Sequence, residues 1–337
     1  MDVDPPGALV LAYHVMVAIA QLAPLASVWL RRLRFTLAVA VLWAGLHFLA
    51  GALLFQSGLD RPLVLSAGKG GLLGGLVVTG LLWAGAVIAT LLTGTEDPRQ
   101  PLLTIGLALA LWAGEGGQRG GTMDAWLILR HPDPGPPSGA PYWLLLTDYV
   151  WLLLGVGGAY CIGRRIARQR DRARPQEPPA PGASAVRGPT SHLPGAPSRR
   201  DSLMGLLLTT LIAGASALVL TGSPLAYTRR AQVYFALLVG FLAAVFVTSR
   251  VVRSSTSHLP GTPTPAWCWP APFLLGVIGL VVAGVSPGLM LRPGYERLDT
   301  IPAWALARPL PVEMIGAGLV GVLWLLGPRG ARAAPQR

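Results

Sequence analysis

Apolar residues are gathered into nine long stretches, separated by short polar or proline-rich connections. The stretches cover residues 7–30, 35–55, 72–92, 101–114, 142–162, 203–221, 231–248, 271–291 and 311–326. A helix needs about 17–25 apolar residues to cross a bilayer, so most of these stretches are long enough. The stretch 101–114 is short, and we expect its helix to continue through Glu115 or to end early inside protein; 311–326 is marginal. The pattern predicts an all-α, polytopic integral membrane protein with about nine transmembrane helices.

The charged flanks of these stretches predict which way the chain is oriented. With the N-terminus outside, the inner segments hold 18 of the 27 basic residues and the outer segments hold 9. The connection 163–202 alone holds nine arginines, beginning with Arg164, Arg165 and Arg168. Basic residues next to a span resist translocation, so cytoplasmic loops collect them. We therefore expect an N-out, C-in protein of the bacterial inner membrane. Asp2 and Asp4 precede the first stretch without any basic residue, which favours an N-out anchor over a cleavable signal peptide.

Composition narrows the possible functions further. Charged residues are 12% of the 337 residues, about half the share typical of a soluble protein, and mean hydropathy is +0.53. The formal net charge of +12 lies mostly in predicted cytoplasmic loops beside an anionic leaflet, so we do not expect a nucleic-acid partner. Cys161 and Cys268 both fall near the predicted inner face, a reducing compartment in which a disulfide is not expected. No CxxC or His/Cys spacing predicts a metal site, and no cofactor is expected.

The chain divides into four predicted parts. Residues 1–163 form a five-helix membrane half, and 164–202 form an Arg- and Pro-rich cytoplasmic linker. Residues 203–250 supply two further helices, and 251–337 supply two additional helices and a cytoplasmic tail.

Ionisable residues inside or beside the stretches fall in the outer part of the predicted membrane. They are His14, His47, Lys69, Glu115, Arg119, Asp148 and Glu313. Such groups are costly in lipid and are functional candidates by default, so this asymmetry predicts a polar cavity open to the outer leaflet. Simpler roles are also consistent with the pattern. Lys69 could extend to the headgroups, each histidine could be a helix contact, and Glu313 could interact with a helix dipole. Asp148 needs a partner, which Arg119 or Lys69 could supply.

Four segments resemble the prolipoprotein diacylglyceryl transferase family. Residues 44–55 look like its second helix, and 66–83 are similar to its H-G-G-L-L-G opening of the third, with Lys69 where the histidine is expected. Residues 106–121 look like its fourth helix running into the G-R-x-G signature, with Arg119 as the signature arginine and Gly121 as the final glycine. Residues 220–238 are similar to its final loop and helix. Gln118 replaces a signature glycine, and the sixth stretch lacks the family's second arginine.

The resemblance implies transfer of a diacylglyceryl group from phosphatidylglycerol to the cysteine thiol of a lipoprotein signal peptide. Arg119 would hold the phosphate, and Lys69 would be a second phosphate contact or a base. His47 or His14 would be an alternative base, and Asp148 would orient Arg119. Gly70, Gly71 and Gly121 would let the backbone approach the phosphate beside Glu115. A divergent member could instead only bind such lipid, and the alternative outside this family is a non-catalytic membrane-complex subunit or a small-solute transporter.

Overall fold

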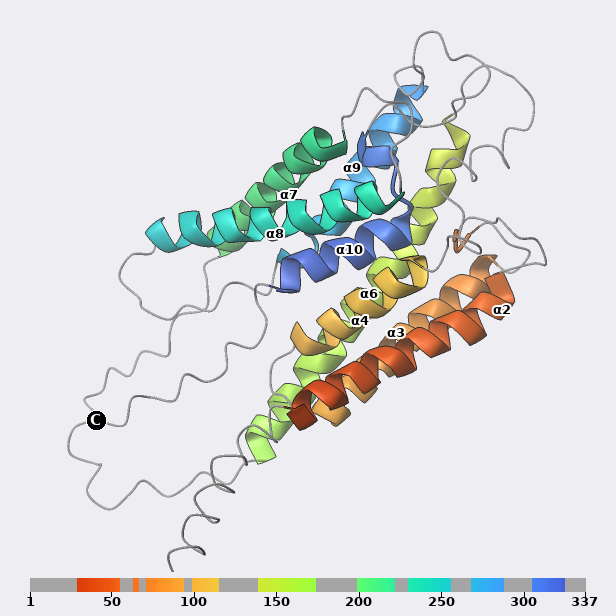
Figure 1. The fold of residues 1–337 in the computed structure, drawn as a ribbon, viewed down its shortest axis with the longest axis vertical. Coiled ribbons are helices and arrows are strands. Elements are labelled where there is room, and N and C mark those ends of the chain that lie inside the picture. The colour runs from red at the N-terminus through yellow and green to blue at the C-terminus, as the bar shows by residue number, and fades with distance from the viewer. Residues whose placement is uncertain are drawn as a thin grey trace, which may run out of the picture.

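In the computed structural model, every regular element of the described chain is a helix, and the helices form one bundle (Figure 1). It describes residues 29–54, 63–66, 71–93, 99–114, 139–173, 199–221, 230–255, 268–287 and 305–324. Within these ranges five helices are long and apolar enough to cross a membrane: Trp29–Leu54, Gly71–Thr93, Ala140–Ile166, Ser202–Leu220 and Gln232–Val251. The protein therefore has the helices of a multi-pass membrane protein.

Eight of the nine predicted stretches lie on helices that the structure describes. The second is already helical at Trp29, where the described range starts, and not only from residue 35, so Arg31, Arg32 and Arg34 belong to this helix. It ends in a π-helical turn, η1 (Leu46–Ala50), followed by α2 (Gly51–Leu54). The others are α3 (Gly71–Thr93), α4 (Arg99–Gly114), α6 (Ala140–Ala173), α7 (Arg199–Thr221), α8 (Arg230–Ser255), α9 (Ala271–Val285) and α10 (Pro311–Trp324). The predicted linker 164–202 is therefore helical at both of its ends. The first stretch, apart from Trp29 and Leu30, lies outside the described residues.

Contacts in the first half of the chain fix the relative directions of three helices. The helix Trp29–Leu54 runs antiparallel to α3, because Leu42 contacts Gly85 whereas Leu54 contacts Gly74. Helices α3 and α6 are parallel. The Thr79 hydroxyl donates to the Trp151 carbonyl at 3.2 Å, and Trp83 Nε1 donates to the Leu154 carbonyl at 3.1 Å.

Contacts in the second half of the chain fix the relative directions of its helices in the same way. Helices α7 and α8 are antiparallel, because Thr209 is 3.2 Å from Thr248 and Gln232 donates to the Leu220 carbonyl. Cys268 lies 3.7 Å from Thr209, and Gly214 faces Leu275, so α9 runs parallel to α7. Helices α6 and α9 are antiparallel, since Gly157 faces Trp269 and Gly284 faces Trp143. Each pairing has the direction expected if successive helices cross in opposite senses.

These directions give the bundle two chemically different ends. One end carries the starts of α3, α6 and α10, and we call it the Asp148 end. The other carries the start of Trp29–Leu54 and the ends of α6 and α8, and we call it the arginine end. Of the arginines in the described ranges, only Arg230 and Arg308 lie at the Asp148 end. Arg32 lies over the exposed Trp29 ring, and Arg250 over Phe246. Arginine beside exposed aromatic rings is typical of a membrane–water interface.

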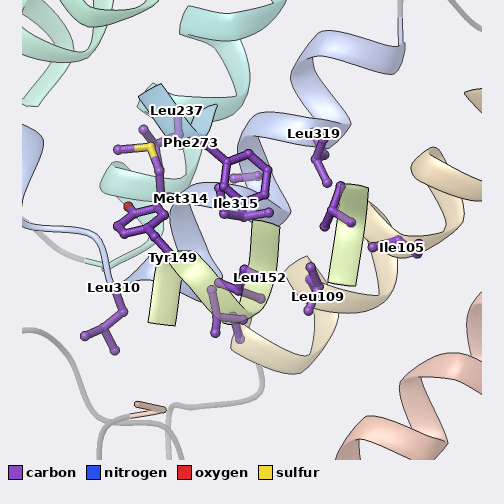
Figure 2. Close-up of a cluster of buried hydrophobic side chains, with 14 of the residues drawn as sticks. Ile105, Leu109, Tyr149, Leu152, Leu237, Phe273, Leu310, Met314, Ile315 and Leu319 are labelled. Atoms are coloured by element: carbon purple, nitrogen blue, oxygen red, sulfur yellow. The ribbon is translucent and has the colours of Figure 1, made fainter. Parts of the chain in front are cut away.

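The short apolar helix α10 is the innermost. Thirteen of its 14 residues, Pro311 to Leu323, are buried, and it packs on α4, α6, α8 and α9 (Figures 1 and 2). A helix that is apolar on every face needs a protein environment or lipid around it, and here the surroundings are protein. The α4–α10 contact is close because Gly316 faces the Ala110 backbone and Gly106 faces Leu319. Helices with glycine at a contact can bring their backbones together. The sequence predicts α9 and α10 to be two additional helices. Both pack against the rest of the bundle, and α10 lies at its centre.

Candidate functional site

Asp148 is the most deeply buried acidic residue of the described chain. It lies two turns into α6, has no exposed surface, and accepts two backbone hydrogen bonds. The Leu65 amide donates to Oδ2 at 2.8 Å, and the Ser66 amide donates to Oδ1 at 2.9 Å. Each carboxylate oxygen therefore holds one of two consecutive N–H groups. Consecutive backbone amides that point at one anion form a strong, oriented binding arrangement.

The segment 63–66 is fixed on several sides by these contacts. Leu63, Val64 and Leu65 are buried, and the Ser66 hydroxyl lies 3.4 Å from the Leu144 carbonyl that it can donate to. At Gly71, an added Cβ would lie 2.7 Å from the Ser66 carbonyl oxygen. Only glycine therefore allows the chain to pass this close to the clasped segment. We call the carboxylate and its two amides the Asp148 clasp.

The described partners of Asp148 are ones that the sequence analysis does not anticipate. An acid in a membrane helix predicts a cationic partner, here Arg119 or Lys69, and both of those residues lie outside the described residues. Among the described residues, the backbone amides of Leu65 and Ser66 donate to Asp148. Sequence reasoning considers side chains first and misses backbone donors. The available signal was Ser66 in a stretch rich in glycine, which is typical of a turn with unpaired amides.

Two further charged residues, Arg308 and Glu313, are buried close to the start of α10. Glu313 Oε2 accepts the Leu310 amide at 2.8 Å, which is the reciprocal half of a helix-capping arrangement. This contact is the helix-start role that the sequence allows for Glu313. Arg308 is also buried, five residues earlier. Tyr149 follows Asp148 on α6, and Figure 2 shows its ring beside Met314. The same tyrosine contacts Gly276 of α9 and packs edge-on to Phe273 at 6.4 Å.

His47 lies within the π-helical turn and is partly buried. Its ring is 4.7 Å from the Phe48 ring, edge to face, and 5.5 Å from the Trp43 ring. Both rings belong to the same helix as His47. A π turn inserts an extra residue into a helix and is frequent at functional sites. His47 is in the half of its helix nearer the Asp148 end.

The structure thus describes three of the predicted site residues and brings two of them together. Ser66 links Asp148 to Gly71, while His47 lies on a separate helix. The other predicted site residues lie outside the described ranges: His14, Lys69, Gly70, Glu115, Arg119 and Gly121. Within the described ranges, His, Cys, Asp and Glu form no group of three that could hold a metal ion.

One buried polar contact towards the arginine end was not predicted. The Thr209 hydroxyl on α7 donates to Thr248 on α8 at 3.2 Å and lies 3.7 Å from the Cys268 sulfur. All three side chains are buried, so this contact ties α7, α8 and the start of α9 together away from water. Its threonines carry no charge, and for that reason a search for ionisable residues overlooks them.

No protein-family model, characterised protein or solved structure matches the chain.

Proposed function

We propose that the chain is a nine-span inner-membrane protein, N-out and C-in, that acts on phospholipid at the Asp148 end. In this proposal the Asp148 end faces the outer leaflet and the arginine end faces the cytoplasm. The distribution of described arginines over the two ends supports this orientation, because basic residues are retained on the cytoplasmic side.

The activity that we propose is a divergent diacylglyceryl transfer. The observation that carries it is the Asp148 clasp. The connection that contains Lys69 runs from Ser66, whose amide donates to Asp148, to Gly71, which packs against the Ser66 carbonyl, so both of its ends lie at the clasp. The Arg119 connection leaves the described chain at Gly114, the end of α4 that lies beside the start of α10. Both candidate cations are thus attached to the Asp148 end by only a few residues of chain.

The proposed chemistry requires one cation and one base at this end. The thiolate of a lipoprotein cysteine attacks the glyceryl carbon of phosphatidylglycerol, an S–C bond forms, and the C–O bond to phosphate breaks. Glycerol phosphate leaves with the electron pair, and the thiol proton passes to a base. Arg119 would neutralise the phosphate by bidentate contact, while Lys69 or a histidine would accept the proton. Asp148 would act as a positioning residue, because backbone amides occupy both of its oxygens.

A direct lipidation assay tests this proposal. The purified protein is reconstituted in phosphatidylglycerol vesicles with a signal peptide containing one cysteine, and mass spectrometry measures the added diacylglyceryl group. Arg119→Ala and Lys69→Ala should lose product, whereas Arg230→Ala, which also removes an arginine at the Asp148 end, should keep it. Normal product from the first two variants rejects these residues. Absence of product from the unaltered protein rejects the transferase activity.

The second candidate is a non-catalytic membrane-complex subunit. The specific observation in its favour is that Asp148 and Glu313 both bind backbone amides within the chain, which stabilises the bundle without requiring a substrate. Co-purification of a membrane partner protein with the full chain, without lipid product in the vesicle assay, would favour this candidate.

A further inference from the structure

Helix α6 is too long to end at the membrane surface. It has 34 residues, so it measures about 51 Å at 1.5 Å per residue, whereas a hydrocarbon core is about 30 Å thick. The apolar part ends near residue 162, and regular helix continues to Ala173. The last three turns therefore project beyond the hydrocarbon at the arginine end.

The projecting turns carry a line of exposed arginines. Arg164, Arg165, Arg168 and Arg172 are all exposed, and their spacing places them within an arc of about 100° around the helix. We call these four residues the arginine stripe. It extends about 12 Å along the axis from Arg164 to Arg172.

Nothing described in the chain neutralises this stripe. No acidic side chain that the structure describes is paired with any of the four arginines, and the sequence 163–173 contains one acid, Asp171. The planar guanidinium group is pre-organised for paired hydrogen bonds, so arginines on one face of a helix favour carboxylate or phosphate partners.

The length and composition of the arginine stripe distinguish between three kinds of anionic partner: lipid, nucleic acid and protein. A headgroup layer is about 5–8 Å thick on each side of the core, so lipid can reach Arg164 and Arg165 but not the full 12 Å. Single-stranded nucleic acid is usually bound by basic residues interleaved with stacking aromatic rings, and residues 163–173 include no aromatic residue. Carboxylates four residues apart on a helix repeat every 6 Å, which is the spacing of Arg164, Arg168 and Arg172.

We propose that the arginine stripe is a docking surface for an acidic helix of a partner protein, which packs along the part of α6 that projects from the membrane. This inference is independent of the proposed lipid transfer. It depends on the exposure and register of α6 and not on the residues of the Asp148 end.

The exposed Cys161 provides a reporter at the base of the stripe. It falls inside the same arc as the four arginines, whereas Cys268 is buried, so a thiol-reactive dye labels Cys161 selectively. The full chain, labelled and placed in nanodiscs of uncharged phosphatidylcholine, is titrated with a helical peptide carrying glutamate at every fourth position. A scrambled peptide of the same composition is the first control.

The expected result is a saturable change in dye fluorescence with the ordered peptide and binding at least about tenfold weaker with the scrambled one. The variant Arg164→Gln/Arg168→Gln/Arg172→Gln should weaken binding about tenfold, since each exposed ion pair contributes a few-fold in affinity. The matched variant Arg31→Gln/Arg32→Gln/Arg34→Gln removes the same charge at the same end and should keep the affinity.

Several outcomes would overturn the proposal. They are no saturable binding, equal losses in the two triple variants, and tighter binding of single-stranded DNA or of phosphatidylglycerol vesicles than of the ordered peptide. A salt titration of the unaltered protein gives an independent answer if a variant fails to fold. Binding through the stripe should weaken steadily towards 1 M salt, where the screening length falls to about 3 Å, and salt-insensitive binding contradicts it.

Discussion

The contact between α4 and α10 gives the sharpest stability prediction. An added Cβ at Gly316 would lie 2.6 Å from the Ala110 amide nitrogen and 2.9 Å from Ala110 Cα. Ordinary contacts between such atoms are about 3.5–4.0 Å, so Gly316→Ala creates an overlap of about 1 Å. The atoms it meets belong to backbone, which cannot rotate away as a side chain can. Relief requires α4 and α10 to move apart, and overpacking of this kind costs about 1–3 kcal/mol.

Gly80→Ala is the matched control. Gly80 lies inside α3, and a Cβ there would meet nothing within 4 Å. Both substitutions gain the same helix propensity of about 1 kcal/mol, so the difference between the two variants isolates the overlap at α10. We expect Gly316→Ala to be about 1–3 kcal/mol less stable than Gly80→Ala.

A reversible denaturation in mixed micelles measures this difference. The purified variants are titrated with sodium dodecyl sulfate, and tryptophan fluorescence follows unfolding. Equal stabilities of the two variants, within about 0.5 kcal/mol, would refute the central position of α10.

Three further outcomes follow from the buried polar contacts and the two ends of the bundle. Asp148→Ala should cost about 2–6 kcal/mol in the same titration because two buried amides lose their acceptors, while Asp148→Asn, which keeps one acceptor, should cost less; equal costs would contradict the clasp. Glu313→Ala should cost about 1 kcal/mol and Glu313→Gln less, since glutamine can still cap Leu310, and the reverse order would exclude capping. In a Cys161→Ser background, a cysteine introduced at the exposed Gln169 (Gln169→Cys) should react with a membrane-impermeant maleimide only from the cytoplasmic side, and Cys268 only after unfolding; labelling of the introduced cysteine from outside would reverse the orientation.

The sequence predicts the helices well because their signal is local. Long apolar stretches with charged flanks identify most of them. The prediction starts the second helix at residue 35 because Arg31, Arg32 and Arg34 interrupt the apolar pattern, whereas the structure shows these three residues to be helical. Arginine at a helix end can extend towards the headgroups, so these residues continue the helix instead of ending it.

The partners of Asp148 and the place of α10 were not predictable in the same way. The clasp joins residues more than 80 positions apart through backbone amides, which every residue except proline carries, so the sequence offers only the weak turn signal of Ser66 and the glycines that follow it. The burial of α10 depends on how four other helices surround it. A 14-residue apolar helix is too short to cross the hydrocarbon core by itself. It does not have to match the thickness of the bilayer when protein surrounds it.

The position of α10 has a consequence for how the protein is made. The innermost helix comes after the other described helices in the chain, so the ribosome synthesises the surrounding helices before α10. Until then, the faces of α4 and α8 that later meet α10 must be covered by lipid or by an insertion factor. A chain arrested before Arg308 would contain all the helices that surround α10 and would still lack the helix that they pack on. We therefore expect membrane proteases to degrade this incomplete product.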